Sequence, residues 1–381
     1  MSSPAVIEAV TANPAIRPTR VEIDLGAVRD NADLIARICG VDLYAVVKAD
    51  AYGHGAIPVA RTLAGVPGVA GFAVSLVEEG TQLRAAGIDA PILVMGPALA
   101  GGEEEIHACR LTAMIGDLGD LERLSQLGRR QGAPIPVHIK VDTGMGRLGM
   151  LADQLERLPH YDGVIVEGIA THFACAETDD PDDPDCATNQ QLARLDAALA
   201  RLAALGIRPQ LVHAANSAGA LRFPAARRDR VRAGIAVYGN GTPAPDGQLR
   251  QAMRFVTEIV QLRTLPEGAS VGYGALWTAR RPTRAAILPV GYADGFPRRL
   301  TGSAGALVGG RRFPVIGAIS MDITVVDVTD LRDAVRVGDE VVLLGTQAGA
   351  AIPTGELAEQ AGVSPYEVTC GVSKRVPRVY G

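Results

Sequence analysis

A lysine stands directly after the first strongly apolar run of the chain. Lys48 follows the run 43–47, and Tyr52, Gly53 and Gly55 come within the next seven residues. Apolar surroundings disfavour the charged form of a lysine, so its pKa falls and its neutral amine becomes nucleophilic. Such an amine can form an imine with an aldehyde or ketone, and the tyrosine and glycine backbone could hold an anion beside it. The stretch predicts a reactive lysine; the competing interpretation is a surface lysine before a glycine turn.

Short apolar runs alternate with helix-like stretches between residues 43 and 238. The runs are Leu43–Lys48, Gly71–Ser75, Pro91–Gly96, Leu111–Gly116, Pro136–Asp142, Gly163–His172, Pro209–His213 and Val231–Tyr238. Between them, leucines recur at helical spacing in 119–130 and 189–205. Eight strands separated by crossovers predict an α/β fold with parallel strands. They favour a (β/α)8 barrel, and an open doubly wound sheet is the alternative.

Residue types that can do chemistry fall at the ends of these runs. Arg147 follows the fifth run, His172 ends the sixth, Ser217 follows the seventh, and Arg232 and Gly234 belong to the eighth. Active sites of such barrels lie at the carboxyl ends of the strands, and phosphate sites are often built by the loops after strands seven and eight. The spacing therefore predicts one site at this end of the barrel, with Ser217 and Gly234 placed to hold a phosphate.

The alternation of strand-like and helix-like stretches ends at a stretch of turn-forming residues, 240–250. Strand-like runs then come close together, at Phe255–Leu265, Ala285–Val290, Phe313–Ile319, Ile323–Val328 and Glu340–Leu344. This spacing predicts a second, mostly β domain. One short helix is expected from Ser364, with Pro365 in its first turn and Glu367 as a capping residue. We expect a loose arm at 1–20, the barrel at 21–244 and the β domain at 245–381.

Several motifs along the chain resemble those of the alanine racemases, which use pyridoxal phosphate (PLP). The motifs are Ala45–Gly55 around the lysine, Lys140–Arg147 (KVDTGMGR), Thr171–Ala174, Ala215–Ser217, Arg232–Ile235, Gly272–Gly274, Ser320–Asp322 and Arg375–Arg378. An ordered set of this kind, spread over most of the chain, is far more specific than any one motif. The resemblance implies a racemase of fold-type III with a barrel and a C-terminal β domain.

The resemblance implies two bases on opposite faces of the substrate. Lys48 matches the cofactor lysine, whose amine can remove the Cα proton from one face once the amino acid displaces it. Tyr273 matches the second base, which in the family enters the site from the partner subunit. A single base would tend to return the proton to the face it came from, so inversion needs both. The chain is therefore expected to act as a homodimer. Without the resemblance, Tyr273 would be an ordinary tyrosine in a glycine-rich turn.

The resemblance also implies the residues that hold the cofactor. The expected set is Lys48, Tyr52, His172, Ser217, Arg232, Gly234, Ile235 and Lys374. An arginine facing the pyridine nitrogen discourages its protonation, which suits proton return at Cα and disfavours a PLP decarboxylase. Arg232 could otherwise be an edge-strand arginine paired with the acidic surface. His172 is expected to pack against the ring, although a lone histidine at a strand end is often only structural.

Further residues are implied for the substrate and for support. Arg147 should pair with the substrate carboxylate, and the backbone N–H of Met321 should face it. Lys140, His213 and Asp322 are supporting residues, and Lys140 matches a lysine that is carbamylated in family members; an ordinary ion pair is the alternative.

Two positions depart from the family pattern. Lys374 stands where many members have a phosphate-binding tyrosine, and Ser320 stands where cysteine is frequent.

A different interpretation of the segment 144–149 is a dinucleotide site. Gly144, Gly146 and Gly149 form a G-x-G-x-x-G match after a strand, and Glu167 stands about where a ribose-binding acid would be. However, Glu167 lies inside a run that continues to His172, and this unit is fifth in the series. The simpler interpretation is that the glycines let the chain turn tightly and aim Arg147 inward.

Composition narrows the function classes. The formal net charge of −5 gives no electrostatic support for nucleic-acid binding, and no apolar run reaches membrane-spanning length. Five cysteines without a C-x-x-C pair favour reduced thiols in a cytoplasmic protein over disulfides or a metal site. We expect a cytoplasmic alanine racemase that supplies D-alanine for peptidoglycan. The alternatives are a serine or broad-specificity racemase and a non-catalytic PLP-binding protein.

Overall fold

The computed structural model describes residues 16–97, 101–241 and 249–381, which form two compact units. The barrel unit consists of Ile23–Met253, Ser364–Cys370 and Tyr380–Gly381. The β unit consists of Arg254–Val363 and Gly371–Val379, together with the described residues up to Glu22. Residues 1–15 of the expected arm and residues 242–248 of the turn-rich stretch lie outside the described part. No helix among the described residues is long and apolar enough to cross a membrane.

The barrel unit contains eight parallel strands in the order β8-β7-β6-β5-β4-β3-β2-β9. They are β2 (Asp42–Val46), β3 (Val69–Val74), β4 (Ile92–Val94), β5 (Thr112–Ile115), β6 (Ile135–Lys140), β7 (Val164–Ala170), β8 (Leu211–His213) and β9 (Arg230–Ala233). Backbone hydrogen bonds from Asp229 to Val212 (3.0 Å) and from Arg232 to Ala215 (2.9 Å) join the two ends of this order. The predicted eight-stranded α/β barrel is therefore confirmed, and the open sheet is wrong.

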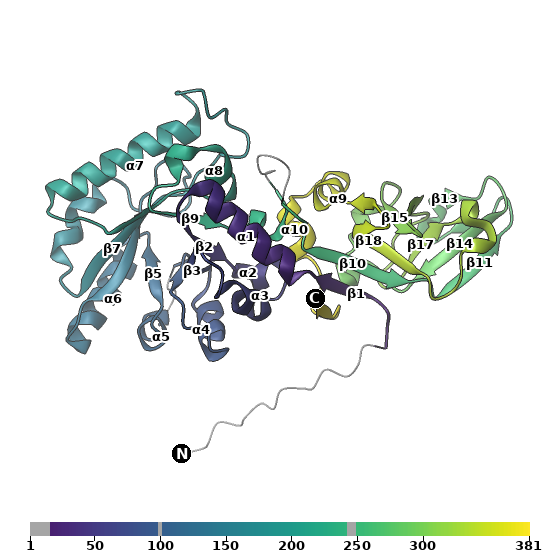
Figure 1. Cartoon of the computed structure of the whole chain (residues 1–381), viewed down its shortest axis with the longest axis horizontal. Helices are drawn as coiled ribbons and strands as arrows, with labels where there is room; N and C mark the ends of the chain where they lie inside the picture. Colours follow the sequence, from purple (N-terminus) through teal and green to yellow (C-terminus); the bar gives the residue numbers. More distant parts are fainter. Residues whose placement is uncertain (1–15, 98–100, 242–248) are drawn as a thin grey trace, which may run out of the picture. The chain divides into compact units, whose positions relative to one another are not determined.

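Helices lie around the strands of this unit (Figure 1). They are α1 (Leu25–Cys39), α2 (Lys48–Tyr52), α3 (Ala56–Leu63), α4 (Val77–Ala85), α5 (Gly102–Ala108), α6 (Leu118–Gln131), α7 (Ala187–Ala204), α8 (Ser217–Arg222) and α10 (Pro365–Cys370). The Asp24 side chain caps α1 by accepting from the Ala27 N–H at 2.7 Å, and Gly40 ends it with a φ of 67°. α10 begins as predicted, because Glu367 accepts from the Ser364 N–H.

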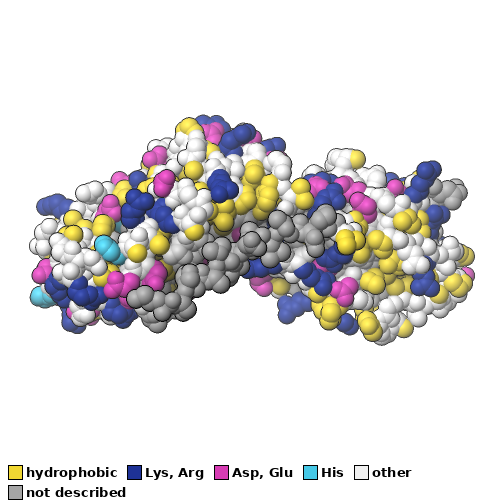
Figure 2. Space-filling view, turned by 90° about the horizontal axis from the view of Figure 1, so that it is seen from below, with side chains coloured by type: hydrophobic (Ala, Val, Ile, Leu, Met, Phe, Trp, Pro, Cys, Tyr) yellow, Lys and Arg dark blue, Asp and Glu magenta, His cyan; other side chains and the backbone are white. Residues whose placement is uncertain are grey.

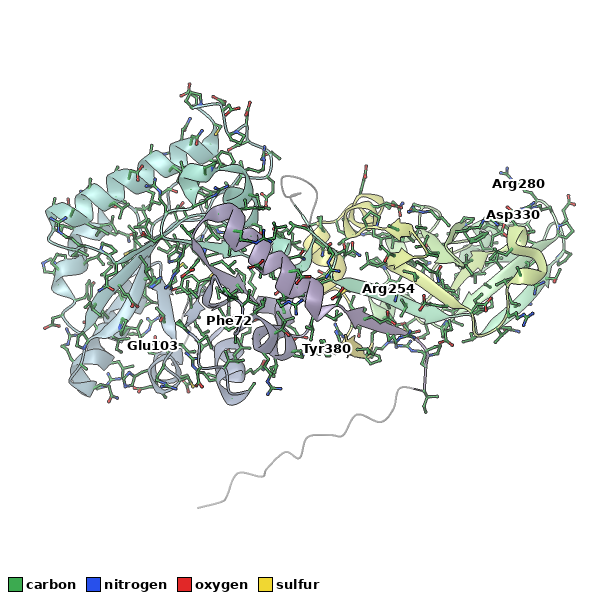
Figure 3. All side chains as sticks on the ribbon, in the orientation of Figure 1. Phe72, Glu103, Arg254, Arg280, Asp330 and Tyr380 are labelled. Carbon is green, nitrogen blue, oxygen red and sulfur yellow. The ribbon has the colours of Figure 1, made fainter. Side chains whose placement is uncertain are left out.

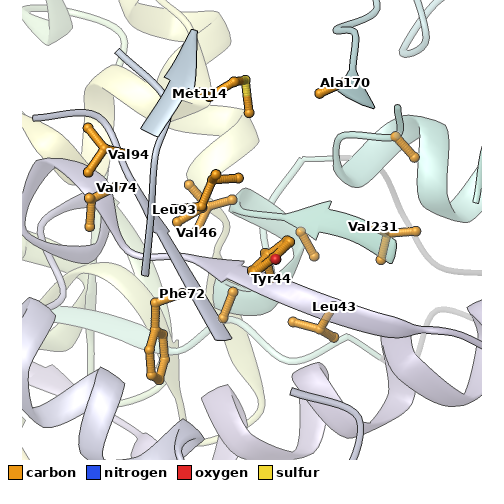
Figure 4. Packing of buried hydrophobic residues seen from close by; sticks show 14 of the residues in the cluster. Leu43, Tyr44, Val46, Phe72, Val74, Leu93, Val94, Met114, Ala170 and Val231 are labelled. Carbon is orange, nitrogen blue, oxygen red and sulfur yellow. The ribbon is translucent and has the colours of Figure 1, made fainter. Parts of the chain in front are cut away.

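The buried apolar core of the barrel unit comes from both faces of the strands (Figure 4). Leu43, Phe72 and Leu93 are fully buried or nearly so. Burying one such side chain stabilises the fold by roughly 1.5–3 kcal/mol. The interior also holds polar groups: Tyr44 lies edge-on to His138 and His213, with ring centroids 6.4 and 5.8 Å away. Buried polar groups are costly unless they are hydrogen-bonded, which constrains the site described below.

The β unit is built from antiparallel strands. One sheet has the order β16-β15-β18-β10-β1-β20 with β19 beside β18, another the order β11-β14-β17, and β12 pairs with β13. The strands are β1 (Arg20–Ile23), β10 (Met253–Glu258), β11 (Gln261–Leu265), β12 (Ser270–Val271), β13 (Trp277–Thr278), β14 (Thr283–Leu288), β15 (Gly305–Val308), β16 (Arg311–Pro314), β17 (Thr324–Asp327), β18 (Glu340–Gln347), β19 (Ala350–Ile352) and β20 (Arg378–Tyr380). With helix α9 (Thr354–Ala361), they confirm a mostly β C-terminal domain.

Three predicted strands differ from the observed ones. The run 255–265 is two strands in different sheets, because the chain changes sheets at Ile259–Val260. The run 231–238 is a strand only to Ala233, since Gly234 has φ −114° and ψ −94° and a 3₁₀ turn, Ile235–Tyr238, follows. The run 313–319 is a strand only to Pro314.

A fully buried carboxylate fastens several segments of the β unit. Asp294 accepts from Arg17 Nη1 (3.0 Å) and Nη2 (2.6 Å), from Arg375 Nε (2.7 Å) and from the Gly291 N–H (3.0 Å). Arg375 also donates to Asp322 at 2.6 Å. Burial raises the pKa of Asp294, but the hydrogen bonds from Arg375 and Arg17 outweigh it and hold the pKa below its ordinary value. Elsewhere, acidic and basic side chains are interspersed on the face drawn in Figure 2.

Replacing this carboxylate should destabilise the β unit. Asp294→Ala removes the buried carboxylate to which Arg17, Arg375 and the Gly291 N–H donate; both arginines keep access to water, so we expect a loss of roughly 1.5–3 kcal/mol, about that of one hydrogen bond to a charged group. Since the folded pKa is depressed, this stability is present above pH ~4 and is lost as the pH falls through the folded pKa. Urea unfolding between pH 3 and 7 measures both effects. The control is Asp330→Ala, because Asp330, which is labelled in Figure 3, makes an exposed pair with Arg281; equal losses in both variants would contradict the prediction.

Candidate active site

Lys48 begins a backbone turn of the wrong hand for ordinary residues. It comes directly after Val47 at the end of β2, and the next four residues, Ala49 to Tyr52, have φ between 51° and 54°. The left-handed conformation costs roughly 1–2 kcal/mol for each residue with a Cβ. Gly53 and Gly55, at φ 84° and 94°, continue the turn without that cost. Strain of this size persists only where surrounding contacts fix it, and such segments are typical of functional sites.

Two carboxylates hold this turn. Glu79 in α4 accepts from the Ala49 N–H at 2.6 Å, and Asp50 accepts from the Ala56 N–H at 2.7 Å. Sequence reasoning missed Glu79. Its only visible signal was its place in the first turn of a helix after a strand, which ordinarily indicates capping.

The amine of Lys48 lies in surroundings that disfavour its charge. Burial lowers its pKa most, and Arg147 lowers it further, while Glu79 acts in the opposite direction. Neutral amine is therefore more available at a given pH than for an exposed lysine.

Arg232 lies buried inside the barrel, surrounded by hydrogen-bond acceptors. Its guanidinium donates to the carbonyls of Thr171 (2.6 Å), His213 (2.8 Å) and Ala214 (2.9 Å). It also contacts Nδ1 of His213 at 2.7 Å and Nδ1 of His172 at 3.3 Å. Burial lowers its pKa to about 10, which still leaves it charged at neutral pH. The interpretation of Arg232 as an edge-strand arginine paired with the acidic surface is wrong.

A chain of two buried histidines continues from Arg232. Because a guanidinium only donates, Nδ1 of His213 must accept, and its Nε2 therefore carries the proton and donates to His138 Nδ1 at 2.8 Å. The proton of the neutral His138 ring is then on Nε2, which lies 3.9 Å from Glu167 Oε2 without a hydrogen bond. Burial lowers the pKa of both rings, that of His138 to about 4, with Arg232 adding to the effect. Both histidines are neutral at neutral pH, so they do not repel the arginine.

Lys140 adds another amine to this cationic cluster. It is 7% exposed at the end of β6, and burial and the charges of Arg232 and Arg147 lower its pKa to about 8. Among the described residues, no hydrogen bond or ion pair of its amine is present. The ordinary ion pair considered as an alternative for Lys140 is therefore not formed with any described residue.

Arg147 lies in a tight loop that follows β6. The Asp142 carboxylate accepts from the N–H groups of Gly144 (2.9 Å), Met145 (2.9 Å) and Gly146 (3.1 Å). The loop ends where Val141 bridges to Met150, and no helix opens at its glycines; the next element is a 3₁₀ helix, Gln154–His160. A dinucleotide site would need a helix opening at these glycines, so that interpretation is wrong.

The residues predicted to hold a phosphate lie together. Ser217 Oγ accepts from the N–H groups of Gly234 (3.0 Å) and Ala236 (3.3 Å). A Cβ added to Gly234 would lie 2.4 Å from the hydroxyl of Tyr52, so only glycine leaves room for that hydroxyl. Tyr52, Ser217 and Gly234 therefore lie against one another, and Ile235 follows directly in the chain; hydroxyl and backbone N–H groups are the kinds of group that bind phosphate.

Tyr52 is supported by other aromatic residues. Its ring centroid lies 5.3 Å from that of Tyr238 and 5.7 Å from that of Tyr366, and His54 stacks on Tyr238 at 4.4 Å. Burial raises the pKa of Tyr52, so its hydroxyl stays protonated and can donate. The sequence did not indicate a role for Tyr366 in the site, because the residue was expected only as part of the short C-terminal helix.

The other predicted site residues belong to the β unit. Tyr273 is 70% exposed between Gly272 and Gly274, whose φ values are 69° and 76°. Met321 is 52% exposed. Its carbonyl accepts from the Ala293 N–H, and the Ser320 carbonyl accepts from the Tyr292 N–H.

Three further side chains of the β unit complete this description. Asp322 is held by Arg375, and Lys374 is exposed. Tyr292, an exposed tyrosine beside the Met321 segment, was missed from sequence.

Comparisons with known proteins agree with this geometry. Residues 23–242 match the model of the alanine racemase N-terminal domain, and residues 252–380 match that of the C-terminal domain. The chain belongs to the alanine racemase family. It is 47% identical to the alanine racemase of Symbiobacterium thermophilum over 96% of this chain and 98% of that protein. The expected enzyme class, an isomerase that racemises alanine, is thereby confirmed.

Solved structures of the family have the same fold. The alanine racemase of Streptomyces coelicolor is 35% identical, with a TM-score of 0.89 over 96% of this chain and 98% of that one. The alanine racemase of Bartonella henselae, solved with covalently bound pyridoxal phosphate, is 30% identical, with a TM-score of 0.86 over 97% of this chain and 100% of that one. The family thus implies PLP, which agrees with the donor groups around Tyr52 and Ser217.

A methyl group at Gly234 should disturb the residues that are expected to bind the phosphate, Tyr52 and Ser217. Gly234→Ala would place its Cβ against the Tyr52 hydroxyl and displace it. We expect PLP affinity to fall at least tenfold, equivalent to roughly 1.4 kcal/mol, in equilibrium titration of the apoprotein. Gly65→Ala is the matched control, since a Cβ there meets nothing within 4 Å. Unchanged affinity in Gly234→Ala would show that the phosphate lies elsewhere.

Proposed function

We propose that this chain interconverts L- and D-alanine by a two-base mechanism, with PLP attached to Lys48. The observation that carries the proposal is the strained turn that presents Lys48 at the strand ends, where Arg147 and Arg232 also contribute charge. Family membership supports the reaction, and the residue roles rest on the motifs and on this geometry.

The residues present fit PLP. Tyr52, Ser217 and the N–H groups of Gly234 and Ile235 would bind its phosphate, with Lys48 as the point of attachment. His172, which is half-buried and contacts Arg232, would pack against the ring. When bound, PLP delocalises the negative charge left at Cα after proton removal. Lys374 would add a point charge near the phosphate where the family often has tyrosine.

Arg232 would face the pyridine nitrogen and keep it unprotonated. Its position is fixed by three carbonyl groups and by the neutral histidine chain. A charged donor held this rigidly disfavours a second positive charge beside it, which limits how much of the Cα charge moves into the ring. Proton return at Cα is then favoured over transamination.

Proton transfer would use two groups. Lys48, whose amine has a lowered pKa, would accept the Cα proton on one face. Tyr273 would act on the other face. Arg147 and the Met321 N–H would hold the carboxylate, so that Cα stays aligned with both bases while the proton is exchanged.

We propose that Tyr273 and Met321 act in the site of a second copy of the chain. Exposed apolar side chains of the β unit gather in linked segments: Tyr273, Leu276, Tyr292, Met321 and Ile323 are 38–70% exposed. These segments lie close together: a Cβ added to Gly272 would come within 3.3 Å of the Ala318 backbone, and the Tyr292 N–H bonds to the Ser320 carbonyl. A surface of this kind is typical of a protein interface, which supports a homodimer.

We further propose that Lys140 carries a carbamate. Carbon dioxide would add to its neutral amine with loss of one proton, and the resulting anion would neutralise part of the charge of Arg147 and Arg232. The lowered pKa of about 8 makes that amine available. Native mass spectrometry in bicarbonate buffer should show one added carbon dioxide per chain, and Lys140→Gln should lack it. If bicarbonate adds no mass to the wild-type protein, the carbamate is rejected.

The product D-alanine would serve peptidoglycan synthesis in the cytoplasm. All five cysteines are free thiols, which supports a reducing compartment. Serine differs from alanine by one hydroxyl, and shape alone separates such substrates poorly. Ser320, beside Met321, is the departure that would alter this preference, so serine is the competing substrate to assay.

Substitution of the two bases tests the mechanism. Lys48→Ala should lose the visible band of lysine-bound PLP near ~420 nm and all racemisation. Tyr273→Phe should keep that band and slow proton abstraction from one enantiomer by about 10²–10⁴-fold, with a much smaller effect on the other. The measurements are absorbance spectra and deuterium washout from each enantiomer. Equal small effects on both enantiomers would contradict two bases.

Mixing the two inactive variants tests the shared site. A heterodimer of Lys48→Ala and Tyr273→Phe has one site with both intact residues and one with neither. We therefore expect about a quarter to a half of wild-type sites to recover after subunit exchange. No recovery, with heterodimers shown by native mass spectrometry, would mean that each site is built from a single chain.

A further inference from the structure

The carboxylate of Glu79 joins two backbone segments that are distant in sequence. Its Oε1 accepts from the Ala49 N–H at 2.6 Å. Its Oε2 accepts from the N–H groups of Ser75 (2.8 Å) and Leu76 (3.1 Å). The bonds to Ser75 and Leu76 cap the start of α4, which is an ordinary role for a glutamate at this position. The bond to Ala49 is additional and reaches the residue directly after Lys48.

The turn at Lys48 needs an external support. Four consecutive residues with side chains, Ala49 to Tyr52, have positive φ, a conformation that they would leave in the absence of fixed contacts. Within the turn, the Ala51 N–H bonds to Val47 and the Gly53 N–H to Ala49. The Ala49 N–H is the first amide after Lys48, and Glu79 is its partner.

We propose that Glu79 is a positioning residue for Lys48: by holding the Ala49 amide it fixes the left-handed turn and aims the lysine amine at its reaction partner. The inference rests on the proposed role of Lys48 and adds a residue to which the sequence motifs assign no role. Glu79 does not touch the reacting atoms, and it acts only through the backbone and through its charge.

The charge of Glu79 acts in the same place. The other charged or titratable groups that act on Lys48 are Arg147, Arg232, Lys140, Cys370 and His172. Arg147 and Arg232 are cationic, and so is Lys140 as long as its amine carries no carbamate; the Cys370 thiol is neutral because burial raises its pKa, and the His172 ring is neutral because burial lowers its pKa. Among the described residues, Glu79 is thus the carboxylate that favours the charged amine. Removing its charge should move the titration of Lys48 to lower pH.

Glu79→Gln separates positioning from capping. The glutamine carbonyl can still accept from Ser75 and Leu76, which offer two N–H groups on that side. Its NH2 group would then face the Ala49 N–H, donor against donor. The variant therefore keeps the cap of α4 and loses the support of the turn. Glu78→Gln is the matched control, because it removes a carboxylate from the adjacent, exposed position of the same helix turn.

The experiment compares wild type, Glu79→Gln and Glu78→Gln as full-length apoproteins. Hydrogen exchange by mass spectrometry follows peptides that cover 47–53 and, separately, α4. Borohydride trapping of added PLP on Lys48, across pH 6–10, follows the reactivity of the amine. Thermal unfolding follows overall stability.

For Glu79→Gln we expect at least tenfold faster exchange confined to 47–53. We also expect a pH midpoint for trapping that moves down, and at least tenfold weaker PLP affinity. Glu78→Gln should match wild type throughout. Glu79→Asp, which keeps the charge but is one methylene shorter, should show the faster exchange without the full shift in midpoint. It also replaces Glu79→Gln should that variant fail to fold.

Two outcomes would overturn the proposal. In the first, Glu79→Gln and Glu78→Gln show the same hydrogen exchange at 47–53 and the same trapping of PLP on Lys48. The other is faster exchange spread equally over α4 and 47–53 with a matching fall in melting temperature, which would mean that Glu79 only caps a helix. If wild type traps no PLP on Lys48, the proposed role of Lys48 fails, while the exchange comparison still decides whether Glu79 holds the turn.

Discussion

Arg232 places a permanent positive charge inside the barrel, and no carboxylate of the described residues hydrogen-bonds to it. A guanidinium can only donate, so every group around it has to accept. Carbonyl groups do this at no electrostatic cost, but a histidine can do so only through an unprotonated nitrogen. The direction of the hydrogen bond from His213 to His138 follows from this one donor, since it fixes which nitrogen of His213 accepts. Burial is the main cause of the lowered pKa of His213 and of Lys140, and the charge of Arg232 adds to both shifts.

Two carboxylates near the site accept hydrogen bonds from backbone groups and not from Arg232. Asp142 accepts from the loop that carries Arg147, and Glu79 accepts from the turn that follows Lys48. Because these carboxylates are committed to backbone N–H groups, they shape the loops and neutralise the guanidinium groups only in part. The end of the barrel keeps an excess of positive charge. Such a field favours anionic ligands, and the proposed cofactor phosphate and substrate carboxylate are both anions.

Much of the barrel could be predicted because each strand and helix is a local pattern repeated many times. The errors came where one backbone position overrides the pattern. Gly234 ends β9 early, although the apolar run continues to Tyr238, and the chain changes sheets at Ile259–Val260 without a turn-forming residue. The left-handed turn at Ala49 to Tyr52 is also invisible in sequence, since alanine does not signal positive φ. Its cause is the contact with Glu79, thirty residues away.

Some residues of the candidate site could also be predicted from local patterns, and others could not. Lys48, Arg147, His172, Ser217 and Arg232 could be placed from strand ends alone, because a parallel barrel brings those ends to one face. Tyr273, Met321 and Lys374 could not, since they lie in a β unit whose geometry no local pattern relates to the barrel. Their roles came only from the resemblance. The partners of Arg232 also escaped prediction, because a surface arginine and a buried one look the same in a sequence.

The exposure of Tyr273 bears directly on how a second base could work. A tyrosine that is 70% exposed between two glycines with positive φ is held out from its own unit, in contact with water. Water would exchange the proton that such a base must deliver to a chosen face, so selectivity requires water to be excluded. Several exposed side chains near Tyr273 and Met321, among them Leu276 and Ile323, are apolar and can form such a dry contact. In the proposed dimer, the apolar surface around Tyr273 and Met321, which is exposed to water in the single chain, would close the site of the partner.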